Sequence, residues 1–293
     1  MLKFIHQKMN RDYVRIAEDI HLHYRSVGEG KTIVLFHPSP RSSKIFEPFG
    51  ALLAPHFRVV MPDLFGYGQS DALPIPVNSL YDYLPYLKEA FDKLGLENFV
   101  IYGTATGAQL GIAYAKTYPD DVSALFLDNA AEFSDDQREI FLEKYFVDAT
   151  PKADGQHLEN LWDHLKKSLY YFPWYSEKEA DKIRHSPLPE NLEAEICNEI
   201  LKDSLIGGVH YADGYKAAFE HEKVENVLQL RVPTTIFRWA GSPILKYIDQ
   251  LLGHDFPKNI KIVEISAENR YAEMIEKIKK KPLLNPPRWG GFP

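Results

Sequence analysis

Short apolar runs alternate with helical patterns along the first 130 residues. Residues 32–37 and 57–62 are nearly continuous apolar runs, which are typical of strands buried on both faces of a parallel sheet. Residues 79–95 carry apolar side chains at helical spacing. Because strands and helices alternate, we predict a parallel sheet covered by helices on both faces. Further strands are predicted at 11–18, 20–28, 99–102 and 123–128, and further helices at 43–55 and from about 105.

The pattern changes to helices alone over residues 133–228. A capping box formed by Ser134 and Gln137 opens this region. We therefore predict an α/β fold with an eight-stranded, mostly parallel core at 1–132 and 229–293, and an inserted helical cap at 133–228. Such a cap would cover the carboxyl edge of the sheet, where α/β proteins place their sites. The cap helices are predicted at 156–171, 176–185, 189–205 and 210–228, and the later core elements are strands at 234–240 and 260–266 and helices at 244–252 and 268–280.

Composition and charge exclude several classes of function. The 293 residues carry 34 Lys and Arg against 41 Asp and Glu, a net charge of −7, which argues against nucleic-acid and acidic-membrane partners. No apolar segment is long enough to span a membrane, and the N-terminus lacks a signal-peptide core, so we expect a cytoplasmic protein. His21 and His23 share one face of a strand but lack a third ligand, so we predict an exposed strand face and no metal or other cofactor. The expected partner is a small-molecule substrate or ligand, and the sequence leaves a homodimer open.

Three loops that each follow a predicted strand carry the candidate chemistry. They are HPSPRS at 37–42, DLFGYGQSD at 63–71 and GTATG at 103–107. The third has the frame G-x-x-x-G between a strand and a helix, which permits the sharp turn called a nucleophile elbow. The middle residue of such a turn projects above the sheet, beside the first amides of the helix.

In this order the three loops resemble the oxyanion loop H-G-x-P, the loop D-x-x-G-x-G-x-S and the elbow G-x-S-x-G of α/β-hydrolase-fold proteins. The chain further resembles a bacterial subgroup of that fold with P-R-S after the oxyanion histidine, H-T-G-A at the elbow and D-G-x-H-L-x-x-L-W in the cap. The resemblance implies an oxyanion hole formed by the backbone N–H groups of Ser39 and Thr106. It also places the nucleophile position at Ala105.

The chain departs from that family at the positions of the catalytic triad. Ala105 has no nucleophilic atom, Ser242 stands where an acid is expected, and no histidine follows His254. We therefore predict an enzyme without a Ser-His-Asp triad that uses the retained oxyanion hole for hydrolysis or for lyase, isomerase or cyclase chemistry on a small, partly apolar carbonyl compound. One alternative is a non-catalytic ligand-binding protein. Another is a serine hydrolase in which Ala105 replaces an original serine.

Two groups are candidates for proton transfer near residue 105. His37 follows a buried strand beside the predicted pocket, although it could equally be a structural histidine bonded to a neighbouring loop. Asp128 ends a strand at the same edge, where some members of the fold place their acid. Asp63 is predicted to hold its loop in place.

The predicted substrate-binding residues come from the oxyanion loop and from the cap. Arg41 could clamp a carboxylate, or could pair with Asp63 or Asp71. The remaining candidates lie in the predicted cap helices and are His157, Trp162, His210 and Tyr211.

Overall fold

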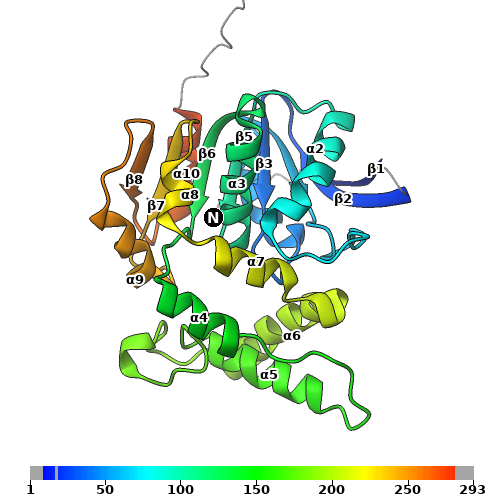
Figure 1. Ribbon diagram of the computed structural model, residues 1–293, viewed down its shortest axis with the longest axis vertical. Helices are drawn as coiled ribbons and strands as arrows, with labels where there is room; N and C mark the ends of the chain where they lie inside the picture. The colour runs from blue at the N-terminus through cyan, green and yellow to red at the C-terminus, as the bar shows by residue number, and fades with distance from the viewer. Residues whose placement is uncertain (1–8, 17–18, 281–293) are drawn as a thin grey trace, which may run out of the picture.

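Eight strands form one sheet in the order β1-β2-β4-β3-β5-β6-β7-β8 (Figure 1). This computed structural model describes residues 9–16 and 19–280. Strand β2 pairs antiparallel with β1 and with β4, and all other neighbours pair in parallel. The predicted eight-stranded, mostly parallel sheet is therefore confirmed. The strands are β1 Asn10–Ile16, β2 Ile20–Val27, β3 Thr32–Phe36, β4 Arg58–Pro62, β5 Phe99–Thr104, β6 Val122–Asp128, β7 Thr234–Arg238 and β8 Ile260–Glu264.

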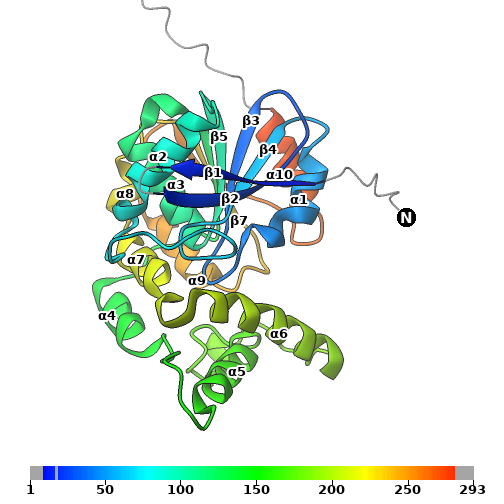
Figure 2. The same cartoon turned by 90° about the vertical axis from the view of Figure 1, so that its right-hand side faces the viewer.

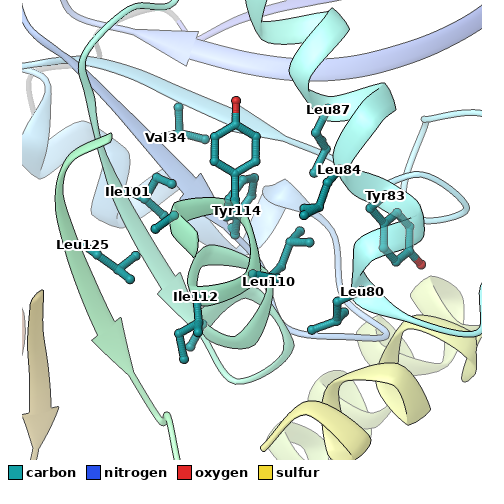
Figure 3. Close-up of a cluster of buried hydrophobic side chains, with 14 of the residues drawn as sticks. Val34, Leu80, Tyr83, Leu84, Leu87, Ile101, Leu110, Ile112, Tyr114 and Leu125 are labelled. Carbon is teal, nitrogen blue, oxygen red and sulfur yellow. The ribbon is translucent and has the colours of Figure 1, made fainter. Parts of the chain in front are cut away.

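Helices cover both faces of the sheet, because its central strands are apolar on both sides. On one face lie α1 (Glu47–Leu53) and α10 (Arg270–Lys279), which pack against side chains of β3, β4 and β5. On the other face lie α2 (Leu84–Lys93), α3 (Thr106–Thr117) and α8 (Val224–Leu228). Figure 3 shows this second layer, in which Leu110 and Tyr114 of α3 are buried with Val34, Ile101 and Leu125 of the strands.

The segment between β6 and β7 is helical apart from its loops. Figures 1 and 2 show α4, α5 and α6 beyond one end of the sheet, while α7 lies between them and α3. The final part of the segment packs on the core, because Ala217, Ala218, Val224 and Val227 share one buried cluster with the sheet. None of the helices in the described ranges is both long and apolar enough to cross a membrane. The helices α4 to α7 between β6 and β7 are α4 Asp135–Lys144, α5 Gln156–Ser168, α6 Glu190–Gly207 and α7 Asp213–His221.

Two predicted helices are wrong in part. Residues 176–185 contain only the 3₁₀ turn Glu179–Asp181, because their backbone pairs with the preceding chain: Phe172 N–H donates to Asp181 O, and Ile183 N–H donates to Tyr170 O. The predicted helix at 210–228 is interrupted at Glu222, which ends α7 before α8 begins. The other short elements are α9 Leu245–Ile248 and 3₁₀ turns at Ser43–Phe46, Leu80–Tyr83, Pro119–Asp121, Gly208–His210 and Asp249–Gly253.

The strand bearing His21 and His23 is not the exposed face that the sequence predicts. His23 is buried, because β2 lies inside the sheet, and its Nδ1 lies 2.8 Å from Asp63 Oδ2. His21 is partly exposed and lies beside Asp71. Within the described ranges, no three His, Cys, Asp or Glu side chains are grouped so that they could hold a metal ion.

Candidate functional site

The turn between β5 and α3 holds residue 105 in a strained conformation. Ala105 has φ 49° and ψ −117°, a region that costs a non-glycine residue about 1–3 kcal/mol. A Cβ atom at Gly103 would overlap the backbone of Gly107, and one at Gly107 would overlap the backbone of Phe36. Only glycine therefore permits the close approach of helix and strand on each side of Ala105. The turn places Ala105 in the wall of a cavity.

The two predicted oxyanion donors reach the same cavity as Ala105. Thr106 is the first residue of α3, so its N–H group has no acceptor within the helix. Ser39 lies in the loop after β3, and within the described residues no backbone carbonyl accepts its N–H group. Both residues line the cavity beside Ala105. The site can therefore offer two amide donors to a negatively charged or polarised oxygen.

The cavity has a volume of about 320 Å³ and lies between the carboxyl edge of the sheet and the inserted helices. A volume of this size is at the lower end of the range for small-molecule sites, about 300–1,000 Å³. Its apolar walls come mainly from the inserted segment, and its polar groups from both the sheet edge and the inserted segment. The aromatic lining residues are Phe133, Tyr145, Phe172, Tyr215 and Phe219, and the polar ones include Arg41, Asn129, His164, Ser168 and Glu222.

Neutral hydrogen bonds join the loops after β6 and β7 at the cavity edge. Ser242 Oγ donates to Asn129 Oδ1 at 2.7 Å, and Asn129 Nδ2 donates to Thr104 Oγ1 at 3.1 Å. After β8, the Arg270 guanidinium stacks on the Trp239 ring at 4.4 Å. Ser242, where the resemblance places an acid, thus belongs to a hydroxyl–amide pair, and Arg270 of the loop after β8 is stacked on an aromatic ring.

His37 is held by backbone groups and is not among the residues that line the cavity. Its Nε2 accepts the N–H of Leu64 at 2.9 Å, and its Nδ1 lies 3.0 Å from Pro38 O. Burial lowers the pKa of His37, and nearby Asp63 opposes this only in part. A neutral imidazole with both nitrogens occupied fits the alternative of a structural histidine that ties the first loop to the second.

Asp128 is also turned away from the cavity, so its predicted catalytic role is not supported. Its carboxylate accepts hydrogen bonds from Trp239 Nε1 at 2.8 Å and from the Tyr102 hydroxyl at 3.0 Å. Both partners belong to the apolar layer under α1 and α10. Burial raises the pKa of Asp128 despite these donors. The group therefore ties the sheet to that layer.

Arg41 is the one predicted substrate-binding residue that lines the cavity. Its Nε donates to Asp203 Oδ2 of α6 at 2.8 Å. The pairing predicted with Asp63 or Asp71 is wrong, because α6 descends onto the oxyanion loop and supplies a closer carboxylate. Arg41 thus links the first loop to the inserted helices at the rim of the site.

The other four predicted binding residues lie outside this cavity. His157 accepts the N–H of Lys152 near the start of α5, and Trp162 does not line the cavity. His210 is largely exposed and pairs with Asp213, while the buried Tyr211 hydroxyl bonds to the backbone of Val147. None of the four is therefore placed to contact a ligand in this cavity.

A buried histidine and a buried glutamate of the cavity are missing from the sequence-based prediction. His164 shares the inner face of α5 with Leu161 and Leu165, and the apolar periodicity of that helix could have indicated it. Burial lowers the pKa of His164 to about 4. Glu222 lies in a His-Glu-Lys run that looks like a solvated helix end, so no signal in the sequence marks it as buried.

Comparison with known proteins agrees with this geometry. The family model for the alpha/beta hydrolase fold matches residues 31–266. The chain belongs to the α/β-hydrolase fold family. It is 32% identical over 132 residues to 2-hydroxy-6-oxononadienedioate/2-hydroxy-6-oxononatrienedioate hydrolase 1 of Pseudomonas putida, covering 42% of this chain and 46% of that protein. A second such hydrolase of the same species is 37% identical over 125 residues, covering 39% of this chain and 43% of that protein. The matched segment thus spans less than half the length of these relatives.

Solved structures of the α/β-hydrolase fold share the whole architecture at low sequence identity. An epoxide hydrolase from Vigna radiata has a TM-score of 0.69 at 18% identity, over 94% of this chain and 98% of that one. An enol-lactonase from Burkholderia xenovorans has a TM-score of 0.62 at 20% identity, over 91% of this chain and 98% of that one. Likeness at this level of identity shows the fold.

Proposed function

We propose that this α/β-hydrolase-fold chain is an enzyme that acts on a small, partly apolar carbonyl compound without a Ser-His-Asp triad. The observation that carries the proposal is Ala105, which stands on the strained elbow and presents only a methyl group to the cavity. A methyl group cannot form an acyl-enzyme. The hydroxyl–amide pair of Ser242 and Asn129 supports the same conclusion, because neither group would orient a catalytic imidazole as a carboxylate does.

The amides of Ser39 and Thr106 supply the proposed source of catalysis. A donor of this kind is worth about 2.7–4 kcal/mol when it meets the oxygen that gains charge in the transition state. Such stabilisation requires no nucleophile from the protein. Attack by water on a carbonyl group and elimination or isomerisation through an enolate both develop charge at one oxygen, so both reaction classes fit.

The cavity and the relatives support the substrate class. Aromatic walls and a volume of about 320 Å³ suit a compact apolar body with few polar groups. Two relatives are hydrolases of 2-hydroxy-6-oxononadienedioate, and a structural neighbour is an enol-lactonase. These names support a carbonyl compound as the substrate of this chain.

A second candidate function is ligand binding without catalysis. It is favoured by Ala105 itself and by the rings of Phe133 and Phe219, which give the cavity apolar walls. A panel of esters, lactones and ketones followed by nuclear magnetic resonance separates the two. The enzyme converts at least one of these compounds, whereas a binding protein raises its unfolding temperature with a compound that stays unchanged.

The absence of a serine mechanism is tested with a fluorophosphonate probe. We expect no covalent labelling of the purified protein. We also expect Ala105→Ser to gain little esterase activity, because among the described residues no hydrogen-bonded imidazole–carboxylate pair lines the cavity beside residue 105. Labelling of the parent protein at a cavity serine would contradict the proposal. A large gain from Ala105→Ser alone would reveal a functional base beside residue 105.

A further inference from the structure

The carboxyl group of Glu222 is buried in the cavity wall and lacks a hydrogen-bond partner for one oxygen. Only 3% of the residue is exposed, and Oε2 has no partner within the described residues. The backbone is fixed on both sides: Glu222 N–H donates to Ala218 O at 3.0 Å, and Glu222 O accepts Phe133 N–H at 3.1 Å. The side chain is therefore held against the cavity by its position at the end of α7.

The surroundings of this carboxyl group contain little that would stabilise a negative charge. Gln109, one turn after Thr106 on α3, is its polar neighbour, and its Oε1 lies 2.8 Å from His221 Nδ1. The other titratable groups near it are His221, buried and neutral, and Tyr215 on α7, whose hydroxyl faces Tyr145.

Lys116 and Lys223 are the nearby cations, and both lower the pKa of His221. Burial raises the pKa of Glu222 well above its usual range, and Gln109 lowers it by less. A neutral carboxylic acid has one O–H donor, and Glu222 lines the cavity in which a ligand would lie. The same environment disfavours a ligand that brings a negative charge to this end of the cavity.

We propose that Glu222 is the general acid of the cavity and donates its proton to a second oxygen of a substrate whose carbonyl oxygen is held by the amides of Ser39 and Thr106. The inference rests on the proposed function. Its substrate class is a neutral compound with two oxygen functions, such as an ester, a lactone or a 1,3-dicarbonyl compound.

The proton transfer balances without a further reactant. As the second oxygen gains negative charge, the O–H bond of Glu222 breaks and a new O–H bond forms on the substrate. Glu222 is left as a carboxylate, which burial destabilises. It therefore recovers a proton from water or from the product at the end of the cycle.

The protonation state of Glu222 can be measured without any substrate. We expect the infrared spectrum near neutral pH to contain the C=O stretch of a protonated carboxylic acid, and we expect Glu222→Gln to remove it. Glu220→Gln is the matched control, because Glu220 is exposed one residue before His221 on the same helix and should leave the band unchanged. An ionised Glu222 at neutral pH would overturn the inference while leaving the proposed function intact.

Contact with a ligand is tested with benzoylacetone, a neutral aromatic 1,3-diketone. We expect its binding to shift the band of Glu222 to lower frequency, because the acid then donates a hydrogen bond. Glu222→Leu should weaken binding about tenfold or more, since one hydrogen bond to a buried acceptor is lost, whereas Glu222→Gln keeps a donor and should bind within about threefold of the parent. Thermal unfolding of each variant verifies that it is folded.

Each other outcome decides against a part of the inference. Binding of benzoylacetone with an unchanged band would make Glu222 a structural group. A folded protein that binds none of the diketone would overturn the substrate class. Equal binding by Glu222→Leu and the parent would remove the proposed donor role.

Discussion

Two buried carboxyl groups at the same edge of the sheet have opposite surroundings. Asp63, in the loop after β4, accepts hydrogen bonds from the N–H groups of Ser43 at 2.7 Å and Gln69 at 2.9 Å, and its Oδ2 lies 2.8 Å from His23 Nδ1. Glu222, at the end of α7, has one oxygen without any partner in the described residues. One carboxyl group is surrounded by donors, and the other faces a cavity.

The difference appears in the pKa of each group. Burial alone would raise the pKa of Asp63, but the hydrogen bonds from His23, Ser43 and Gln69 outweigh it and hold that pKa well below its usual range. Burial raises the pKa of Glu222, and the opposing effect of Gln109 is too small to cancel this rise. A carboxylate whose oxygens are all hydrogen-bonded holds loops in place, whereas a carboxylic acid with an oxygen that lacks a partner is available to a ligand.

Replacing each carboxyl group by an amide should give the largest difference between the two sites, measured as the change in unfolding free energy. We expect Asp63→Asn to lose about 3–5 kcal/mol of unfolding free energy, because the new NH₂ group meets donors and the buried charge is removed. Glu222→Gln should change the unfolding free energy near neutral pH by less than about 1 kcal/mol, since one neutral group replaces another. Urea unfolding of both variants measures this. Equal losses would show that Glu222 is ionised or structurally paired.

The buried histidine of the cavity should make the protein sensitive to acid. Burial lowers the pKa of His164 from 6.5 to about 4, so the folded state binds fewer protons than the unfolded state within that interval. The contribution of neutral His164 to the unfolding free energy is therefore fully present above the pKa of the unfolded state. It is lost as the pH falls, by an amount on the order of 3 kcal/mol.

His164→Gln is the variant that isolates this effect in urea unfolding between neutral pH and pH about 4. It should lose less stability than the parent over the same interval. His221, whose pKa burial lowers to about 3, leaves some acid sensitivity in the variant. Identical pH profiles of variant and parent would mean that His164 is not buried as a neutral group.

The strained elbow gives a smaller effect of opposite sign. Ala105→Gly should raise the unfolding free energy by about 1 kcal/mol, because glycine tolerates the positive φ and this gain exceeds the added entropy of the unfolded chain. The matched control is Ala108→Gly inside α3, which should lose about 1 kcal/mol or more. Thermal unfolding compares the two, and a loss at both positions would argue against strain at residue 105.

The ion pair at the rim of the cavity should contribute least. Arg41 and Asp203 remain 25% and 14% exposed, so solvent screens their attraction. We expect Asp203→Asn to lose less than about 1 kcal/mol of unfolding free energy. A loss as large as that of Asp63→Asn would show that this partly exposed pair, and not only the hydrogen bonds of Asp63, holds the loops at this edge.

The loop motifs of the sequence predict where backbone groups lie, but not which partners the side chains bind. Ser39, Ala105 and Thr106 reach one cavity, as the loop motifs predict, because the position of a tight turn fixes where its amides point. His37 and Asp128 follow the correct strands, but their side chains turn to Leu64 and to Trp239, and no local pattern reveals such partners.

The sequence by itself determined the order of strands and helices, the helical insert and the geometry of the elbow. Apolar periodicity and glycine spacing act over a few residues, so they can be recognised in one dimension. Only the tertiary structure decided that His164 and Glu222 face the cavity and that His23 is buried. Burial and pKa depend on which distant segments pack together: Glu222 meets Gln109, 113 residues earlier in the chain, only because α7 lies on α3.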